Sequence, residues 1–364
     1  MPSDGKLRPF TVTGIGSLPF STPDAALELI ARCMPVVPHW PQLPRRSRQE
    51  FFTNQFLGLL VRLGLLREAP EGWHFAPDSP GWVPGLTAFY ERYLASASGE
   101  EAADREFAPS PEAAGGLYAF AEAFASGRFA AAETVKGQVA GPLSVGLSLF
   151  DREGKPAYYD PQLRELVVNC LARSAAWQAR MLAERCRRPV VIFVDDPAVG
   201  AWGTSQHVGL DREAIVADLA EIARAVREAG AVPGIHCCAG VDWSIPLAAG
   251  FVVLSFDAHG FFSPLLVHSR ELAPFLAAGG VLAWGLVPTS PQAWEETPSS
   301  LARRWRGGVR MLEERGLDGE LLRRQCILTP SCGTGLLEPD LAVHIYELTA
   351  ATGELLRDSF SPGT

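Results

Sequence analysis

Short apolar segments rich in β-branched residues alternate along this chain with longer stretches of helical character. The short segments are bounded by Gly, Pro or Asp, and the longer ones are rich in Ala, Leu, Arg and Glu. Such alternation is typical of βα units that build a parallel sheet. It predicts eight strands, at residues 10–16, 35–38, 134–140, 189–195, 232–236, 251–257, 281–286 and 326–330.

The helices between these strands begin with recognisable signals. Thr22 and Thr297 each precede a proline, and a capping hydroxyl followed by Pro at the first helical position is a common helix start. The predicted helices span residues 23–34, 160–187, 211–229, 269–278, 298–315 and 339–357.

Residues 45–130 do not fit a minimal barrel. They contain three further helical runs, at residues 51–66, 87–96 and 112–125, separated in part by a piece rich in Pro, Gly and Trp. We interpret this stretch as a helical insertion after strand two that covers one end of the barrel. The pattern therefore predicts an α/β fold, a (β/α)₈ TIM barrel, with residues 1–364 forming a single domain.

Composition narrows the classes of partner. Hydrophobic residues make up 47% of the chain, and the net charge is −9 with the basic residues dispersed. We therefore expect neither nucleic acid nor a membrane surface as a partner. The first ten residues lack the apolar core of a signal peptide, and no apolar run reaches the roughly 18 residues of a membrane span, so we expect a cytoplasmic protein. The odd count of seven cysteines favours reduced thiols over disulfides.

Reactive polar residues cluster where predicted strands end. They follow strands one, four, five, six and eight, and comprise Ser17, Asp195, His236, Cys238, Asp257 and Cys332. The C-terminal ends of barrel strands converge on one face, where barrel enzymes build their active sites. We therefore expect these side chains to share one site.

Four of these residues form a candidate metal-ligand set. His236 and Cys238 alternate on an extended chain and so face the same way, while Asp257 and Cys332 follow later strands. Thiolates combined with an imidazole favour zinc over magnesium or calcium. By spacing alone, a buried thiol pair beside a hydrogen-bonded histidine is the alternative.

The segments GIHCCAG (234–240), VVLSFDAHG (252–260) and LTPSCGTG (328–335) resemble the C-terminal catalytic barrel of the cobalamin-independent methionine synthase family. That family belongs to the uroporphyrinogen decarboxylase/methionine synthase-like superfamily. The resemblance implies a Zn²⁺ ion held by His236, Cys238, Asp257 and Cys332. Asp257 stands where the family usually has Glu.

Three further segments extend the resemblance. TGIGSLP (13–19) resembles the family's Ile-Gly-Ser loop, which implies that Gly16 and Ser17 hold the carboxylate of homocysteine. FVDDPAV (193–199) resembles its Asp-Glu-Pro-Ala motif, which implies that Asp195 holds the substrate ammonium. In PHWPQLP (38–44), Gln42 stands where the family has a Glu that contacts this ammonium.

The resemblance implies a zinc-dependent methyltransferase that activates homocysteine and forms methionine. The full enzyme has two barrels and is about twice as long, and WGLVPTS (284–290) lacks the histidine that protonates a folate nitrogen as the methyl group leaves. A methyl–cobalt bond needs no such acid. We therefore predict methylcobalamin or a corrinoid protein as methyl donor, with methyltetrahydrofolate as the alternative.

Three other functions stay open at this point. A related zinc enzyme could methylate coenzyme M or another small thiol. Uroporphyrinogen decarboxylase has the same barrel type, needs no metal and clusters charged groups for its substrate's carboxylates. A non-enzymatic protein could bind zinc or a thiol without turnover.

Overall fold

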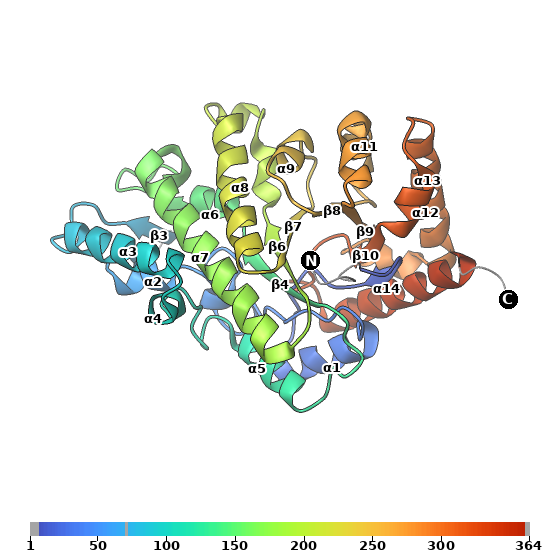
Figure 1. The fold of residues 1–364 in the computed structure, drawn as a ribbon, viewed down its shortest axis with the longest axis horizontal. Coiled ribbons are helices and arrows are strands. Elements are labelled where there is room, and N and C mark those ends of the chain that lie inside the picture. Colours follow the sequence, from blue (N-terminus) through green and yellow to red (C-terminus); the bar gives the residue numbers. More distant parts are fainter. Residues whose placement is uncertain (1–6, 70–71, 361–364) are drawn as a thin grey trace.

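The computed structural model describes residues 7–69 and 72–360 (Figure 1). Its centre is a seven-stranded parallel sheet in the order β1-β10-β9-β8-β7-β6-β4. Most of its residues are buried, as expected for a parallel sheet covered by helices. The strands are β1 (Thr11–Val12), β4 (Val135–Ala140), β6 (Val190–Asp195), β7 (Val232–Cys237), β8 (Val253–Asp257), β9 (Val281–Val287) and β10 (Cys326–Pro330).

The predicted second strand is wrong. Residues 35–38 are within the described part of the chain and form no strand, because the prolines at both ends of this range have no N–H to donate to a ladder. The segment that follows makes two isolated bridges instead, His39 with Lys136 of β4 and Gln42 with Ser17 just after β1. An irregular segment thus links the two edge strands, where the sequence predicted the eighth member of a closed barrel.

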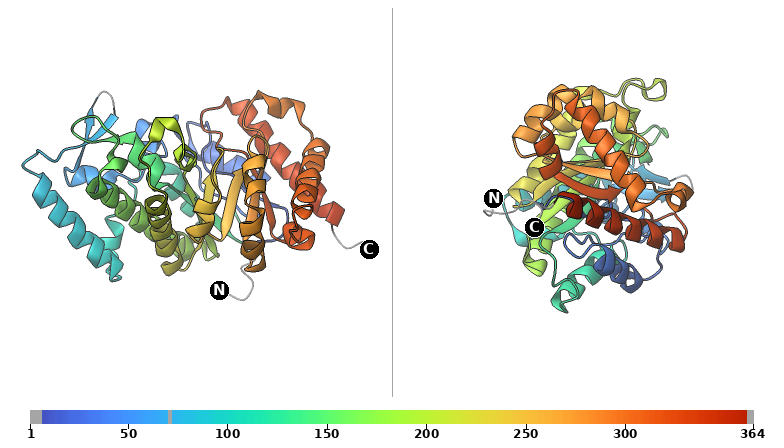
Figure 2. Two further views of the ribbon diagram at one scale, coloured as in Figure 1. Left: turned by 90° about the horizontal axis from the view of Figure 1, so that it is seen from above. Right: turned by 90° about the vertical axis from the view of Figure 1, so that its right-hand side faces the viewer.

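The helices surround the strands (Figure 2). The six predicted between strands are confirmed as α1 (Pro23–Cys33), α7 (Pro161–Cys186), α8 (Arg212–Glu228), α11 (Ser269–Ala277), α12 (Pro298–Glu313) and α14 (Pro339–Phe360). Four shorter helices lie in the connections, α6 (Pro142–Ser148), α9 (Ser244–Ala248), α10 (Phe262–Val267) and α13 (Gly319–Arg324). Of the described helices, none is both long and apolar enough to span a bilayer.

Most of the insertion lies at one end of the molecule, opposite the C-terminal helices, but its last helix (residues 115–125) lies beside α1 (Figure 1). The helix predicted at residues 51–66 is wrong, because only α2 (Gly58–Arg62) forms there. Residue 66 instead begins a small sheet, in which β2 (Leu66–Ala69) pairs with β3 (Gly72–Phe75) and β3 pairs with β5 (Leu149–Phe150).

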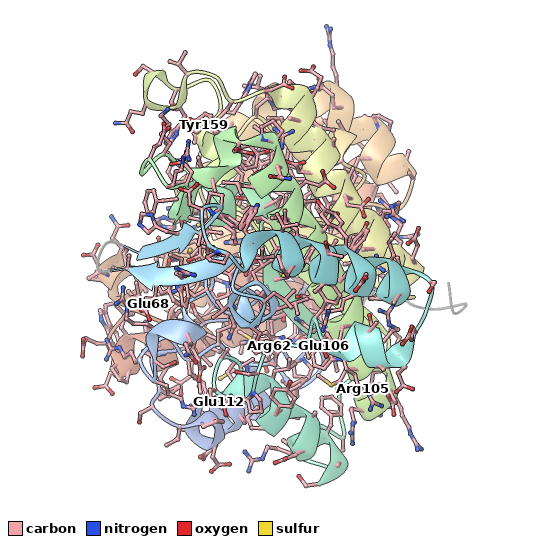
Figure 3. All side chains as sticks on the ribbon, turned by 90° about the vertical axis from the view of Figure 1, so that its left-hand side faces the viewer. Arg62, Glu68, Arg105, Glu106, Glu112 and Tyr159 are labelled. Carbon is pink, nitrogen blue, oxygen red and sulfur yellow. The ribbon has the colours of Figure 1, made fainter. Side chains whose placement is uncertain are left out.

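The other helices of the insertion are α3 (Trp82–Ala97), α4 (Glu101–Arg105) and α5 (Gly115–Ala125). They pack their apolar faces on the common core, which includes Phe89 and Leu117. Arg62 of α2 donates to the Glu106 backbone oxygen at 2.7 Å and ties α2 to the end of α4 (Figure 3).

Candidate metal centre and substrate cavity

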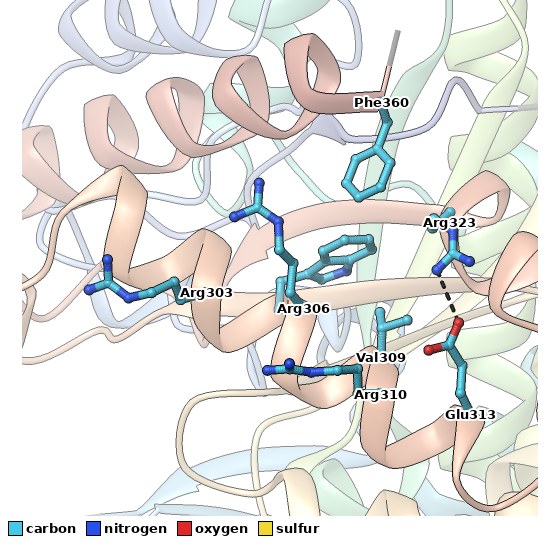
Figure 4. A pocket seen from close by; sticks show the side chains of 8 residues that line it. Arg303, Arg306, Val309, Arg310, Glu313, Arg323 and Phe360 are labelled. Atoms are coloured by element: carbon cyan, nitrogen blue, oxygen red, sulfur yellow. Dashed lines mark hydrogen bonds and ion pairs between the residues drawn. The ribbon is translucent and has the colours of Figure 1, made fainter. Parts of the chain in front are cut away.

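Two hollows differ in the chemistry of their walls. One, of about 340 Å³, lies along α12 and is lined by Arg303, Arg306, Arg310 and Arg323 but by no His or Cys (Figure 4). The other, of about 210 Å³, is lined by His236, Cys332 and Asp195 together with residues that follow β1. The second hollow, hereafter the substrate cavity, therefore holds the groups able to carry nucleophile or metal chemistry.

The sheet explains why these residues meet. Asp195 ends β6, His236 is the penultimate residue of β7, and Cys332 follows β10 by two positions. All three strands are parallel, so their C-terminal ends lie on one edge. The sequence prediction that these segments share one site is thereby supported by the strand order.

His236, Cys238 and Cys332 form one cluster. Each offers one ligand atom, and these atoms lie within 4.8 Å of one another. The Sγ atoms of Cys238 and Cys332 are 3.0 Å apart. Cys237, between the first two, points away and donates to the Asp196 backbone oxygen, as the alternation of an extended chain predicts.

His236 is held so that one ring nitrogen stays available. Its Nδ1 lies 2.9 Å from Ser255 Oγ on the neighbouring strand β8. Its Nε2 is buried and has no hydrogen-bond partner of good geometry. A buried polar atom without a partner is costly, so an Nε2 lone pair facing two sulfurs fits a metal ion, with Ser255 fixing the ring orientation.

The two thiols are joined by a hydrogen bond between their Sγ atoms. This bond, together with nearby His236 and the Gly333 backbone N–H, lowers the pKa of Cys332. The same bond, with burial second, raises the pKa of Cys238. One thiolate is therefore favoured even without an ion, and thiolate is the form that binds metal.

Asp257, the fourth predicted ligand, is outside this cluster. Its Oδ1 accepts the backbone N–H groups of His259 and Gly260, at 2.8 and 2.7 Å. Burial raises its pKa, and the negative charge of Cys332 adds to that rise. Asp257 is thus near enough to sense Cys332 but is engaged in its own turn, and its role as a ligand stays a prediction.

Asp195 lies in the substrate cavity as a desolvated carboxylate. Burial raises its pKa to about 6, while the charge of Lys136 opposes the rise. Its Oδ1 has no hydrogen-bond partner. Lys136 is fully buried and donates to the Ile15 backbone oxygen and to Gln138 Oε1. Asp195 thus lines the cavity with one buried carboxylate oxygen that has no hydrogen bond.

The predicted Gly-Ser loop lies against the loop that carries Cys332. Ser17 Oγ accepts the Gly335 N–H at 3.1 Å, and the Ser17 backbone oxygen accepts the Thr334 N–H at 3.0 Å. At Gly16 a side chain would come within 2.9 Å of the Gln138 and Gln42 side chains, so this position requires glycine. The loop with Gly16 and Ser17 is thus packed directly against the loop that carries Cys332.

Gln42 also lines the cavity, as the sequence predicts. It is 2% exposed, and its Nε2 donates to Gln55 Oε1 at 2.8 Å. Because the amide is anchored in this way, its oxygen is an uncharged acceptor beside Gly16.

Glu50 was missed by the sequence prediction. It belongs to a short 3₁₀ turn, Arg48–Glu50, within the insertion, yet it is 1% exposed and lines the cavity. In the sequence it follows three arginines, a pattern typical of a solvent-exposed charged segment. No motif or spacing therefore indicated that it would be buried. Phe51 and Phe52, which follow it, form an apolar wall with Leu336 and Leu337.

Neither protein-family models nor curated proteins gave a match to this chain. Among solved structures, it is similar to a B12-independent methionine synthase from Shewanella sp. W3-18-1 in complex with selenomethionine, at TM-score 0.45 and 14% identity over 62% of this chain. That match spans 63% of the Shewanella chain. A methyltransferase from Methanosarcina mazei matches at TM-score 0.48 and 15% identity, over 96% of this chain and 95% of that one.

A GH5 cellulase affiliated with Bacteroidetes matches at TM-score 0.37 and 12% identity, over 68% of this chain and 79% of that one. Likenesses this weak assign neither a family nor an activity to the chain. Its function has to be inferred from the site itself.

Proposed function

We propose that this protein is a zinc-dependent S-methyltransferase that activates a small thiol, with homocysteine as the best-fitting substrate and methionine as the product. One observation carries the proposal. An unpartnered imidazole nitrogen and two thiols lie within 4.8 Å of one another, and two of these three residues line a cavity that also holds an unpartnered carboxylate oxygen.

His236, Cys238 and Cys332 would hold the zinc ion. Catalytic zinc sites in proteins usually have three protein ligands and leave one position for water or substrate, which matches the number in this cluster. Zinc bound there would supply Lewis-acid stabilisation of a substrate thiolate at neutral pH. Asp257 is the candidate for a further ligand.

The remaining cavity residues would orient the substrate. The unpartnered Oδ1 of Asp195 is an acceptor for a substrate ammonium. Gly16 and Ser17, packed against the Cys332 loop, are candidates to hold the carboxylate end. Fixing both ends of the amino acid aligns its sulfur with the incoming methyl group, which is worth much of the rate enhancement in bimolecular reactions.

The methyl donor is proposed to be methylcobalamin or a corrinoid protein rather than methyltetrahydrofolate. Departure of a methyl group from a folate nitrogen calls for a positioned acid. Residues 284–290, which end β9 and follow it, contain no acid or histidine, and Thr289 among them is hydrogen-bonded to Ser331. The apolar wall of Phe51, Leu336 and Leu337 would limit access of water to the reacting sulfur.

The test uses zinc-loaded protein and homocysteine with methylcobalamin or methyltetrahydrofolate, with methionine as the readout. We expect methionine from methylcobalamin. Methionine from the folate donor alone would overturn the donor assignment. Absence of product with both donors, together with absence of thiol binding, would overturn the proposed function and leave the non-enzymatic alternatives.

A further inference from the structure

Glu50 is a buried carboxylate whose hydrogen bonding is incomplete. Its Oε2 accepts the Leu43 backbone N–H at 3.1 Å. Its Oε1 lies 2.7 Å from Arg46 Nη1, but without the geometry of a hydrogen bond. Burial raises its pKa to about 7, despite the opposing effects of Arg46 and of the Leu43 N–H. The carboxylate is therefore buried with one ion pair, to Arg46, and with one oxygen that lacks a hydrogen bond.

The substrate cavity thus contains two carboxylates, Glu50 and Asp195, each with one oxygen that lacks a hydrogen bond. The apolar side chains of Phe51 and Phe52 line the same cavity. Two poorly solvated negative groups around one small volume repel an anionic ligand and favour a cationic one. Arg46 offsets part of the charge of Glu50, but it does not line the cavity.

We propose that Glu50 is a specificity-determining residue that, together with Asp195, receives the ammonium group of an amino-acid thiol. This inference rests on the proposed function and narrows its substrate class. A thiol that carries only a sulfonate or a carboxylate, such as coenzyme M, would meet the two carboxylates without a compensating cation. The carboxylate that Gln42 does not provide is supplied from the insertion, eight positions later in the chain.

A purely structural role for Glu50 makes a different prediction. In that case its contacts with Leu43 and Arg46 would only hold the loop between these residues in place. Removal of Arg46 would then disturb the site as much as removal of the Glu50 charge. If Glu50 serves the ligand, removal of Arg46 leaves the carboxyl group in the cavity but raises its pKa, so homocysteine binding should weaken less than in a variant without the carboxyl group and should recover as the pH is raised.

The experiment measures thiol binding to cobalt-loaded protein through the change in the cobalt absorption spectrum. The two probes are homocysteine and 4-mercaptobutanoate, which is the same molecule without its amino group. The variants are Glu50→Gln, Arg46→Gln and, as a matched control, Glu338→Gln, whose carboxylate is 83% exposed and pairs with Arg45.

We expect Glu50→Gln to weaken homocysteine binding by about 10- to 100-fold, the range for loss of one charged hydrogen bond. Its affinity for 4-mercaptobutanoate should be unchanged or higher. Glu338→Gln should bind both thiols as the wild type does, and Arg46→Gln should lose less affinity for homocysteine than Glu50→Gln, because it keeps the carboxyl group. Should Glu50→Gln fail to fold, Glu50→Asp keeps the charge on a shorter arm, and it should weaken homocysteine binding without weakening that of 4-mercaptobutanoate.

Two outcomes overturn the inference while the proposed function survives. One is an unchanged ratio of the two affinities in Glu50→Gln, and the other is an equal loss in Glu50→Gln and Arg46→Gln. A wild-type cobalt spectrum that responds to neither thiol would instead contradict the proposed function, and the assignment of Glu50 would fall with it.

Discussion

Cys238 and Cys332 are 94 residues apart in the chain, and their sulfur atoms lie 3.0 Å apart. The contact joins the loop after β7 to the loop after β10, across two intervening strands of the sheet. With His236 as a third potential ligand, this close approach of two sulfurs is the geometry on which the proposed metal site rests.

Cys332→Ser should lose the metal. A serine hydroxyl is a far weaker zinc ligand than a thiolate, so zinc content should fall from about one per chain toward zero, and methyl transfer should disappear with it. Metal analysis of the purified protein measures this. Cys237→Ala is the matched control, since Cys237 Sγ donates to the Asp196 backbone oxygen and is outside the metal cluster, so its removal should leave the zinc content unchanged. Stoichiometric zinc in Cys332→Ser would refute the ligand assignment.

Ser255→Ala should weaken the metal site without removing a ligand. The Ser255 hydroxyl is hydrogen-bonded to Nδ1 of His236 and fixes the orientation of the ring. Loss of such a partner typically lowers metal affinity about 10- to 100-fold. Competition with a chromophoric chelator gives the affinity. Ser174→Ala removes an equally buried hydroxyl of α7, which donates to the Phe107 backbone oxygen, and it should have no effect on metal affinity. Equal affinities in the two variants would argue against the role of Ser255.

His39 should make the protein sensitive to acid. It is fully buried, its Nδ1 lies 3.0 Å from the Trp40 backbone oxygen, and its Nε2 lies 2.9 Å from the Tyr346 hydroxyl. Burial, and then the charge of Lys136, lowers its pKa from 6.5 to about 3. The unfolded chain therefore binds a proton on the His39 imidazole more tightly than the folded chain does. The stability that neutral His39 contributes is present above pH 6.5 and is lost as the pH falls toward 3.

The measurement is the free energy of unfolding in urea as a function of pH. In that window, His39 should contribute a slope of at most about 1.4 kcal/mol per pH unit. His39→Gln should be less stable at neutral pH, because the packing around the ring is lost, but its slope should be shallower by this amount. A slope identical to that of the wild type would show that His39 is not the titrating group.

Thr297→Ala should lower the free energy of unfolding by about 1 kcal/mol, the usual value of a helix N-cap. Thr297 Oγ1 accepts the Ser300 N–H at 3.1 Å, and Ser300 Oγ accepts the Thr297 N–H at 2.8 Å, so both halves of a capping box are present. Thr22→Ala is the natural comparison, because Thr22 precedes α1 without a side-chain cap bond. Similar losses in the two variants would contradict this reading of the caps.

This pair of threonines also marks what the sequence could predict. The Thr-Pro pattern located the starts of α1 and α12 correctly, since Pro at the first helical position is compatible with only a few conformations. Whether the hydroxyl then caps the helix depends on a side-chain rotamer and on the residue three positions later. At Thr297 that residue is a serine that bonds back, and at Thr22 it is Ala25.

The strands, too, could be predicted where a local pattern determines them. β10 lies at the predicted residues because it is a fully buried apolar run, whereas the prolines around residues 35–38 prevented the second strand. Glu50 could not be predicted, because its burial depends on a short turn that folds the insertion onto the strand ends. Asp257 was assigned through a family resemblance, and the observed turn around its Oδ1 reflects backbone geometry that the sequence does not encode in any simple spacing.

A crystal structure of the zinc-loaded protein, with an anomalous difference map measured at the zinc absorption edge, tests the central claim most directly. The account predicts one strong peak in contact with His236 Nε2 and the Sγ atoms of Cys238 and Cys332, at the edge of the cavity that holds Asp195. A zinc peak elsewhere in the molecule, or a protein that retains no zinc while these three side chains are intact, would contradict it.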